Sequence, residues 1–344
     1  MRIQENISLQ QFNTFGFDVS AAYFSKITSK EDLLASVLWA RTHHLPLHII
    51  GGGSNLVLTE NLPGLTCLMS IEGKEVRQRD ATSTLIRVGA GEDWHDFVTW
   101  TLENDSPGLE NLALIPGTCG AAPIQNIGAY GTEISEFIDQ VEVLDTTLLE
   151  SDNPWIYLSQ PQCEFNYRHS IFKSYPGRFI VTGVTLRLPI PWSPHLEYAD
   201  LKKEFTNTSK PPPIEIFQAV CRVRQSKLPD PKVLGNAGSF FQNPIVSEPK
   251  HSELKEKFPH LISYPTPAIE GQTYFKLAAG WLIDQCGFKG YKMGSVGVYD
   301  KQALVLIHSG GGTGKELLAL AEMINKKIHA VYGVDLIQEP VCLP

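Results

Sequence analysis

The sequence predicts an α+β protein, because segments with the two-residue alternation of strands are interspersed with segments at helical spacing. Hydrophobic residues make up 42% of the 344 residues and charged residues 19%, which is typical of a folded chain. At roughly 150 residues per domain, this length is enough for two or three domains. The 28 glycines and 23 prolines follow no collagen-like period, so their clusters indicate turns, or loops that approach a ligand closely.

The first half of the chain predicts two helices and several short strands. One helix begins after Ser29, with Ser29 and Asp32 as a capping pair, and a second covers residues 94–102. Residues 115–131 show little periodicity and many small side chains, which predicts a long structured loop. Short strands are predicted over residues 46–50, 56–58, 84–88 and 184–188.

Two proline clusters, residues 189–194 and 211–213, bracket Tyr198 and predict a boundary with an excursion between them. Three helices are predicted beyond it, over residues 217–224, 277–285 and 317–331. The last has the most regular apolar spacing, and Gly333 is its predicted stop. The remaining predicted features are a glycine loop over residues 235–238 and a final strand over residues 334–337.

Composition and charge exclude several functional classes. The net charge of −8, from 29 Lys+Arg and 37 Asp+Glu, gives no basic footprint for nucleic acid or an anionic membrane. No apolar run approaches the ~18 residues of a membrane span, and the N-terminus lacks the apolar core of a signal peptide. The six cysteines are widely spaced without a C-x-x-C motif, so we expect reduced thiols in a cytoplasmic protein.

Two glycine motifs look like nucleotide-binding fingerprints but lack required residues. The run that ends at Lys315 is followed by Glu316, not by the Ser or Thr that would bind Mg²⁺ in a P-loop, so we interpret it as the turn that opens the final helix. The Rossmann fingerprint fails because Gly51-x-Gly53 is followed three residues on by Leu56 instead of glycine. The ten histidines show no ligand spacing, and no metal is predicted.

The loop Gly51-Gly52-Gly53-Ser54-Asn55 lies between two predicted strands. Successive glycines let backbone N–H groups converge on an anion such as a pyrophosphate, and Ser54 and Asn55 add donors. A tight structural hairpin explains this loop equally well when it is taken alone. Residues 115–131 favour the first interpretation, because so many small residues make a poor loop unless its backbone lines something flat and large.

Six motifs, in order over nearly the whole chain, resemble those of the UDP-N-acetylenolpyruvoylglucosamine reductases. They are residues 13–16 (NTFG), 115–131 (the flavin loop), 166–173 (NYRHSIFK), 235–244 (the substrate loop), 278–285 (AAGWLIDQ) and 339–340 (EP). The segment with Tyr198 resembles the loop of the longer, type I members. Gly52 is a departure, since some members carry an acidic residue there.

The resemblance implies a fold and its division into domains. It implies an FAD-binding domain of the vanillyl-alcohol-oxidase type in two subdomains, followed by an α+β substrate-binding domain. The first subdomain would comprise residues 1–70 joined by the C-terminal strand 333–344. The second would comprise residues 71–212 with the Tyr198 loop, and the substrate-binding domain would comprise residues 213–332. The residues implied in FAD binding are Gly51, Gly52, Gly53, Ser54, Asn55, Ile115, Pro116, Gly117, Ile124, Asn126, Ile127, Gly128, Ala129 and Tyr130.

The resemblance also implies a reaction, the NADPH-dependent, FAD-mediated reduction of UDP-N-acetylglucosamine enolpyruvate to UDP-N-acetylmuramate in peptidoglycan precursor synthesis. Hydride addition to the vinyl carbon would leave an enolate-like charge beside the substrate carboxylate. Arg168 matches the family's stabilising arginine, and a guanidinium suits that charge. Ser239 matches the family's proton donor, and Glu339 matches the carboxylate that supports the intermediate, either as a protonated donor or by orienting other groups.

Substrate anchoring is expected of a separate set of residues. They are Tyr198, Lys227 and Asn243, with Arg224, Lys276 and Gln285 as further candidates. A lysine offers a point charge for the pyrophosphate, and Tyr198 is expected to close as a lid. We expect a monomer whose partners are NADPH and the UDP-sugar. Two alternatives stay open, a flavin oxidase on the same scaffold and a non-enzymatic nucleotide-sugar binding protein.

Overall fold

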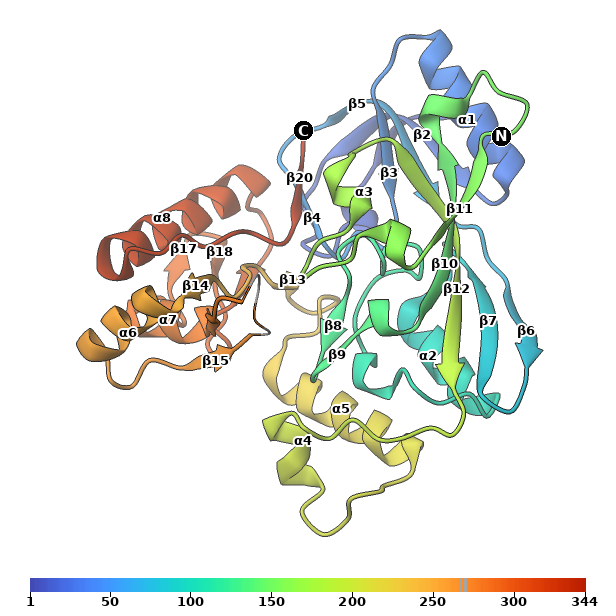
Figure 1. The fold of residues 1–344 in the computed structure, drawn as a ribbon. Helices are drawn as coiled ribbons and strands as arrows, with labels where there is room; N and C mark the ends of the chain where they lie inside the picture. Colours follow the sequence, from blue (N-terminus) through green and yellow to red (C-terminus); the bar gives the residue numbers. More distant parts are fainter. Residues whose placement is uncertain (267, 269–270) are drawn as a thin grey trace. The chain divides into compact units, whose positions relative to one another are not determined.

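The computed structural model describes residues 1–266, 268 and 271–344, which form two compact units (Figure 1). The first unit comprises Met1–Ile7, Ser20–Gly53 and Leu62–Ser226. The second comprises Ser8–Val19, Ser54–Asn61 and Lys227–Pro344. Each unit is therefore assembled from segments that lie far apart in the sequence.

The first unit contains two larger sheets. A four-stranded sheet has the order β1 (Gln4–Ser8), β2 (Ser20–Ile27), β5 (Leu62–Met69), β3 (Leu47–Ile50), and β2 and β3 run parallel to β5. An antiparallel five-stranded sheet has the order β11 (Trp155–Ser159), β10 (Ile138–Asp145), β12 (Phe179–Pro189), β7 (Ser83–Gly89), β6 (Lys74–Arg79). The small hairpin of β8 (Gly128–Ala129) and β9 (Thr132–Glu133) belongs to the predicted flavin loop.

Five helices accompany these sheets, and their ends follow from local chemistry. They are α1 (Lys30–Thr42), α2 (Trp94–Glu103), α3 (Ile171–Ser174), α4 (Ala199–Glu204) and α5 (Pro213–Lys227). The predicted cap of α1 is confirmed, because the Ser29 hydroxyl accepts the Asp32 N–H at 3.1 Å. α1 packs on β2 and β5 (Figure 1), and Leu33 and Val37 on its inner face are buried.

A buried carboxylate ties three strands of the five-stranded sheet together. Glu142 on β10 is 3% exposed, and it accepts hydrogen bonds from the Arg87 guanidinium of β7 at 3.1 Å. The strand between them places Gly183 opposite Glu142, and a Cβ there would lie 2.8 Å from Arg87 Nη2. The missing side chain thus makes room for the ion pair. Lys30 of α1 adds a third contact, with Nζ 3.1 Å from Glu142.

The second unit is smaller and has three sheets. β13 (Gly235–Ser239), β19 (Val305–His308), β18 (Val296–Val298) and β17 (Lys292–Met293) form one antiparallel sheet. β14 (Ile245–Ser247), β16 (Tyr274–Leu277) and β15 (Ser263–Pro265) form another, and β20 (Val341–Leu343) pairs parallel with β4 (Leu56–Leu58). The helices are α6 (Glu248–Lys257), α7 (Ala279–Gln285) and α8 (Gly314–Tyr332).

The predicted final helix is confirmed together with its start and its stop. Thr313 and Glu316 form a capping box, and Gly333 ends α8 in the left-handed conformation at φ 62°. The glycine run before Lys315 is therefore the turn that opens this helix. α8 packs on β18 and β19 through a buried stripe of Leu, Ala and Ile side chains.

Two predicted elements near the substrate loop are wrong. Residues 334–337 form no strand, because the Leu336 N–H donates to the Asn325 side chain of α8, and the last strand lies at β20 instead. The alternating burial of Val334 and Leu336 belongs to an extended segment packed on the core. Residues 235–238 form most of β13, a strand with an irregular register, instead of a loop.

The two units do not follow the predicted domain boundaries, and the three-domain division stays a prediction. α5 lies with the first unit because Ile216, Ala219 and Val220 are buried in its core. The segment Ser8–Val19 lies with the second unit because Phe15 and Phe17 are buried in the other core. The packing of apolar side chains therefore determines to which unit α5 and the segment Ser8–Val19 belong.

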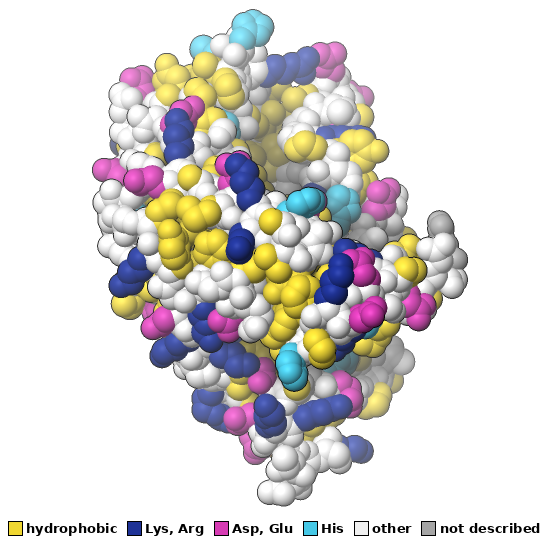
Figure 2. Space-filling view, turned by 90° about the vertical axis from the view of Figure 1, so that its left-hand side faces the viewer, with side chains coloured by type: hydrophobic (Ala, Val, Ile, Leu, Met, Phe, Trp, Pro, Cys, Tyr) yellow, Lys and Arg dark blue, Asp and Glu magenta, His cyan; other side chains and the backbone are white. Residues whose placement is uncertain are grey.

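Acidic and basic side chains are intermixed on the face shown in Figure 2. Among the described residues, no helix combines the length and the apolar character that a membrane span requires.

We expect Glu142→Ala to lower the free energy of unfolding by about 3–5 kcal/mol at pH 7, because it removes the buried counter-charge of the half-buried Arg87 and Lys30 side chains. Desolvation raises the pKa of Glu142, but hydrogen bonds from Arg87 and Lys30 outweigh it and hold the pKa below 4.5. The stabilisation is therefore present above pH 4.5 and lost as the pH falls below it. Urea unfolding at several pH values measures this difference.

The matched control is Glu322→Ala, which removes an exposed ion pair with Lys326 on α8. An exposed pair of this kind contributes little to stability, because solvent screens it. Equal losses in the two variants would contradict the role assigned to Glu142.

Candidate active site

The two glycine loops predicted to bind the flavin lie against each other in the first unit. A Cβ at Gly51 would lie 2.6 Å from Oγ1 of Thr118, and one at Gly52 would lie 3.0 Å from Cα of Gly117. Gly52 therefore lies against the backbone of Gly117 and Gly51 against the side chain of Thr118, and a Cβ at either position would require its neighbour to shift. This contact joins residues from both of the loops that sequence reasoning proposed separately.

The side chain of Asn126 holds the second loop in shape. Asn126 is 1% exposed and has a left-handed backbone at φ 46°. Its Nδ2 donates to Glu133 Oε2 at 2.8 Å and to the Asn166 carbonyl at 3.2 Å, while its Oδ1 accepts the Ser135 N–H. These hydrogen bonds occupy the side-chain amide of Asn126. Its predicted contribution to flavin binding would therefore come from the backbone that the amide positions.

Arg168 lies against the same loop. Its Nη2 donates to the Gly128 carbonyl at 2.9 Å and its Nη1 to the Asn126 carbonyl at 3.4 Å. The guanidinium carbon also lies 5.3 Å from the centre of the Tyr167 ring. The backbone of Arg168 is left-handed at φ 53°, a conformation that costs energy in a residue other than glycine. The structure thus brings the predicted catalytic arginine to the predicted flavin loop.

Tyr130 connects the flavin loop to the predicted lid. Its ring meets the Tyr198 ring edge-on, with 5.2 Å between the centroids. Asn111, which sequence reasoning missed, donates from Nδ2 both to the Tyr130 carbonyl at 3.0 Å and to the His195 carbonyl at 2.9 Å. Burial raises the pKa of Tyr130 to about 12, and nearby Arg224 opposes that rise.

Arg224 projects from α5 toward the same region. Among the described residues it has no ion pair, and its hydrogen bond runs from Nε to the Leu114 carbonyl at 3.3 Å. Desolvation lowers the pKa of Arg224, while Tyr130 and Cys221 oppose this shift. A half-buried guanidinium without a carboxylate partner can bind an anionic group.

In the second unit, the chain places Glu339 beside the substrate loop. The Glu339 N–H donates to the carbonyl of Phe240, the residue after Ser239, at 2.9 Å. Asn55 donates from Nδ2 to the Glu339 carbonyl at 3.2 Å, and its own carbonyl accepts the Val341 N–H. The half-buried Ser239 hydroxyl has no hydrogen bond to another described residue. The structure therefore brings together Ser239, Glu339 and Asn55 from three distant segments.

The other predicted substrate residues of this unit are less closely gathered. The Asn243 side chain accepts the Ala279 N–H at 2.9 Å at the start of α7, which leaves its Nδ2 for a ligand. Lys276 on β16 lies in register with Ile245 and Tyr264, whose side chains are exposed. Gln285 is exposed on the last turn of α7, and none of its hydrogen bonds among the described residues reaches Ser239 or Glu339. Lys227 is the last residue of α5.

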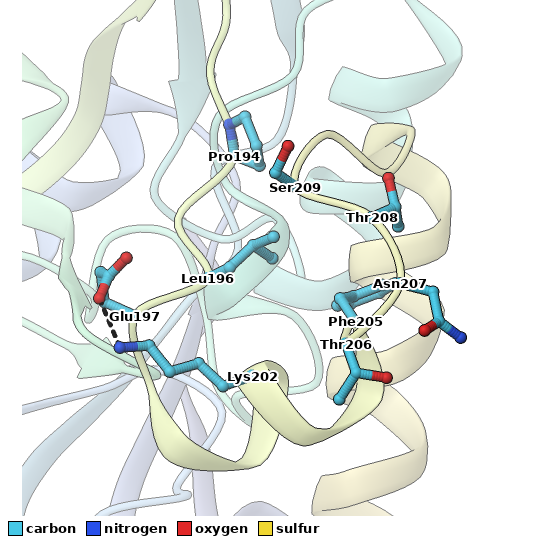
Figure 3. Close-up of a pocket in the computed structure, with 9 residues that line it drawn as sticks. All are labelled: Pro194, Leu196, Glu197, Lys202, Phe205, Thr206, Asn207, Thr208 and Ser209. Carbon is cyan, nitrogen blue, oxygen red and sulfur yellow. Dashed lines mark ion pairs between the residues drawn. The ribbon is translucent and has the colours of Figure 1, made fainter.

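An open pocket of about 540 Å³ lies next to the Tyr198 segment (Figure 3). It is lined by Pro194, Leu196, Glu197, Lys202, Phe205, Thr206, Asn207, Thr208 and Ser209. Lys202 and Glu197 form an ion pair of 2.6 Å at its edge. None of the predicted flavin or substrate residues lines this pocket, so it is separate from the candidate site.

The first unit fits a flavin nucleotide on chemical grounds. Its two loops present closely packed backbone where a Cβ would intrude, and Arg224 offers a cation for a phosphate. Among the described residues, no group of three His, Cys, Asp or Glu side chains could hold a metal ion.

Comparison with known proteins matches both parts of the chain. One family model, "FAD binding domain", matches residues 21–147, and another, "UDP-N-acetylenolpyruvoylglucosamine reductase, C-terminal domain", matches residues 230–343. The predicted FAD-binding domain followed by a substrate-binding domain is thereby confirmed.

Full-length relatives agree with these models. The chain is similar to the UDP-N-acetylenolpyruvoylglucosamine reductase of Polynucleobacter asymbioticus, 51% identical over 98% of this chain and 96% of the relative. That of Cupriavidus pinatubonensis is 51% identical over 97% of each chain. The crystal structure of the reductase from Thermus caldophilus shares the fold, with a TM-score of 0.65 and 24% identity over 100% of both chains.

We expect Gly52→Val to lower the affinity for flavin by an order of magnitude or more, because overpacking costs about 1–3 kcal/mol. The ratio of flavin to protein absorbance after purification, and titration of the stripped protein with FAD, measure the loss. The control is Gly177→Asn, at an open position with φ 79° that asparagine tolerates. Full flavin content in the Gly52 variant would show that the contact with Gly117 does not shape the site.

Proposed function

This chain belongs to the UDP-N-acetylenolpyruvoylglucosamine reductase family, and we propose that it reduces UDP-N-acetylglucosamine enolpyruvate with the residues described above. The product is UDP-N-acetylmuramate, a peptidoglycan precursor. The observation that carries the proposal is the 51% identity to a curated reductase over 98% of the chain. FAD would be held by the two glycine loops, and when bound it would supply the hydride for the vinyl carbon of the substrate, with NADPH as the source of that hydride. The protein acts in the cytoplasm as a monomer.

Arg168 stabilises the negative charge that develops beside the substrate carboxylate. A planar guanidinium matches a carboxylate in geometry and remains charged throughout. Two backbone carbonyls of the flavin loop already hold Nη1 and Nη2, so the side chain is oriented before the substrate arrives. Preorganised charge of this kind costs no rearrangement during the reaction.

Ser239 donates the proton that completes the reduction. A hydroxyl is a weak acid, but an enolate-like carbon is basic enough to take its proton when water is excluded. The hydroxyl is not committed to another described residue, and the buried rings of Phe240 and Phe241 follow it directly. Its place on a paired strand limits how far it can move.

Glu339 supports the charged intermediate as a hydrogen-bond donor in its protonated form. An ionised carboxylate would repel the enolate, whereas a protonated one stabilises it. The hydrogen bond between the Glu339 N–H and the Phe240 carbonyl supports this role, because it fixes the backbone of Glu339 beside Ser239.

The anionic parts of the ligands are held by local cations. Arg224 in the first unit and Lys227 and Lys276 in the second supply charge for phosphates, and Asn243 contributes its Nδ2. Tyr198, whose ring packs on Tyr130, closes over the nucleotide end.

Ser239→Ala should leave flavin reduction by NADPH unchanged and slow reoxidation by the enolpyruvyl substrate by about 10²–10⁴-fold, because the proton donor is lost. Stopped-flow absorbance of the two half-reactions separates these steps. Ser247→Ala, at an exposed position before α6, is the control. Normal reoxidation in the Ser239 variant would remove this residue from the mechanism. Fast reoxidation of the wild-type protein by O₂, indifferent to the UDP-sugar, would instead indicate a flavin oxidase.

Glu339→Gln should retain most of the reoxidation rate, because an amide N–H can donate where the protonated acid donates. Glu339→Ala should lose about 10²-fold, the typical effect of removing one stabilising donor. The same stopped-flow measurement compares the two variants. A loss in the glutamine variant as deep as that in the alanine variant would exclude the donor role.

A further inference from the structure

We propose that Asn236 is a positioning residue for protonation, because its side chain fixes the turn that presents Ser239. The inference rests on the proposed role of Ser239 as proton donor. Asn236 belongs to β13 in the second unit and is 4% exposed. It carries no group that could itself transfer a proton at neutral pH, so it acts through its neighbours.

The amide of Asn236 makes three hydrogen bonds with the backbone. Its Oδ1 accepts the Gly238 N–H at 2.9 Å. Its Nδ2 donates to the Leu234 carbonyl at 2.8 Å and to the Pro229 carbonyl at 3.1 Å. Both amide hydrogens and one acceptor position are therefore used, which is the pattern of a buried polar group that orders its surroundings.

The turn at Gly238 needs this support because the sheet does not supply it. β13 pairs with β19 at Asn236 and again at Ser239, but the register shifts between these two residues. Gly238 within the shift has a left-handed backbone at φ 69°. The side chain of Asn236 holds the Gly238 N–H inside this irregular stretch, directly before Ser239.

The third hydrogen bond links the turn to the loop that follows Lys227. Pro229 lies two residues after that lysine, which is proposed to bind the substrate pyrophosphate. The Asn236 N–H also donates to the Thr14 carbonyl at 3.2 Å, which fixes β13 from the N-terminal segment. One residue thus fixes the relative positions of the Lys227 loop and the Ser239 hydroxyl.

The test uses the flavin-loaded protein and the variant Asn236→Ala. Flavin reduction by NADPH should be unchanged, while reoxidation by the enolpyruvyl substrate should slow by about 10–100-fold, the cost of a displacement near 1 Å at a reacting group. Asn325→Ala is the control, because Asn325 of α8 also orders the backbone through its side-chain amide, by accepting the Leu336 N–H. Reoxidation at the wild-type rate in Asn236→Ala would overturn the proposal.

Two further measurements separate positioning from a general loss of structure. Adding Asn236→Ala to Ser239→Ala should slow reoxidation less than twofold further, because Asn236 acts through the serine. Hydrogen–deuterium exchange over residues 235–240 should be faster in Asn236→Ala and unchanged in Asn325→Ala. A full independent loss in the double variant, or unchanged exchange, would contradict the inference.

If Asn236→Ala fails to fold, Gly238→Ala provides the same test, because Gly238 donates the hydrogen bond that Asn236 Oδ1 accepts. Its Cβ would meet no atom within 4 Å, but its φ of 69° strains an alanine. Reoxidation should again slow while flavin reduction is unchanged. An unaffected reoxidation rate would contradict the proposal that the turn at Gly238 positions Ser239. If Ser239→Ala itself reoxidises normally, the proposed role of Ser239 as proton donor fails, whereas a defect in Ser239→Ala without one in Asn236→Ala overturns only the role of Asn236.

Discussion

The candidate site of the second unit depends on the return of the C-terminal segment to the start of the chain. β20 pairs with β4, and just before β20 the backbone of residues 337–339 hydrogen-bonds to residues 240–242. This pairing alone places Glu339 next to Ser239, although 100 positions separate them in the sequence. The N-terminal segment completes the arrangement, because the Phe15 carbonyl accepts a hydrogen bond from the buried His308 at the end of β19. The arrangement of this candidate site therefore depends on backbone pairing.

Electrostatic attraction of an anionic substrate has to arise locally in this protein. The whole chain carries a charge of −8, and the face in Figure 2 mixes both signs. Backbone carbonyls accept hydrogen bonds from both Arg168 and Arg224, and among the described residues Arg224 has no carboxylate partner. Glu142 shows the opposite arrangement, where a carboxylate is surrounded by cations and serves stability. The same residue types therefore have different roles according to which group accepts their hydrogen bonds.

Much of the fold could be predicted from the sequence, because glycine, proline and cap signals are local, whereas the site residues stay a prediction that rests on the family resemblance. Ser29 and Gly333 mark helix ends by their own chemistry, and the structure confirms both. The strand over 334–337 was predicted wrongly because alternating burial also occurs in an extended segment held by a side chain such as Asn325. The positioning amides of Asn111 and Asn236 were missed, since their partners lie on other segments. Of the two, only Asn236 could have been found from the local sequence, because an asparagine two residues before a glycine is typical of an Asx turn.

The bond from Asn111 to the His195 carbonyl would determine where the proposed Tyr198 lid can bend. The same amide holds Tyr130, so the chain up to His195 moves with the flavin loop. If the Tyr198 ring moves, the movement would therefore begin beyond His195. Only a few residues lie between His195 and α4. Movement over so few residues would be small, and a nucleotide would reach the proposed site beneath a segment that stays fixed to Asn111.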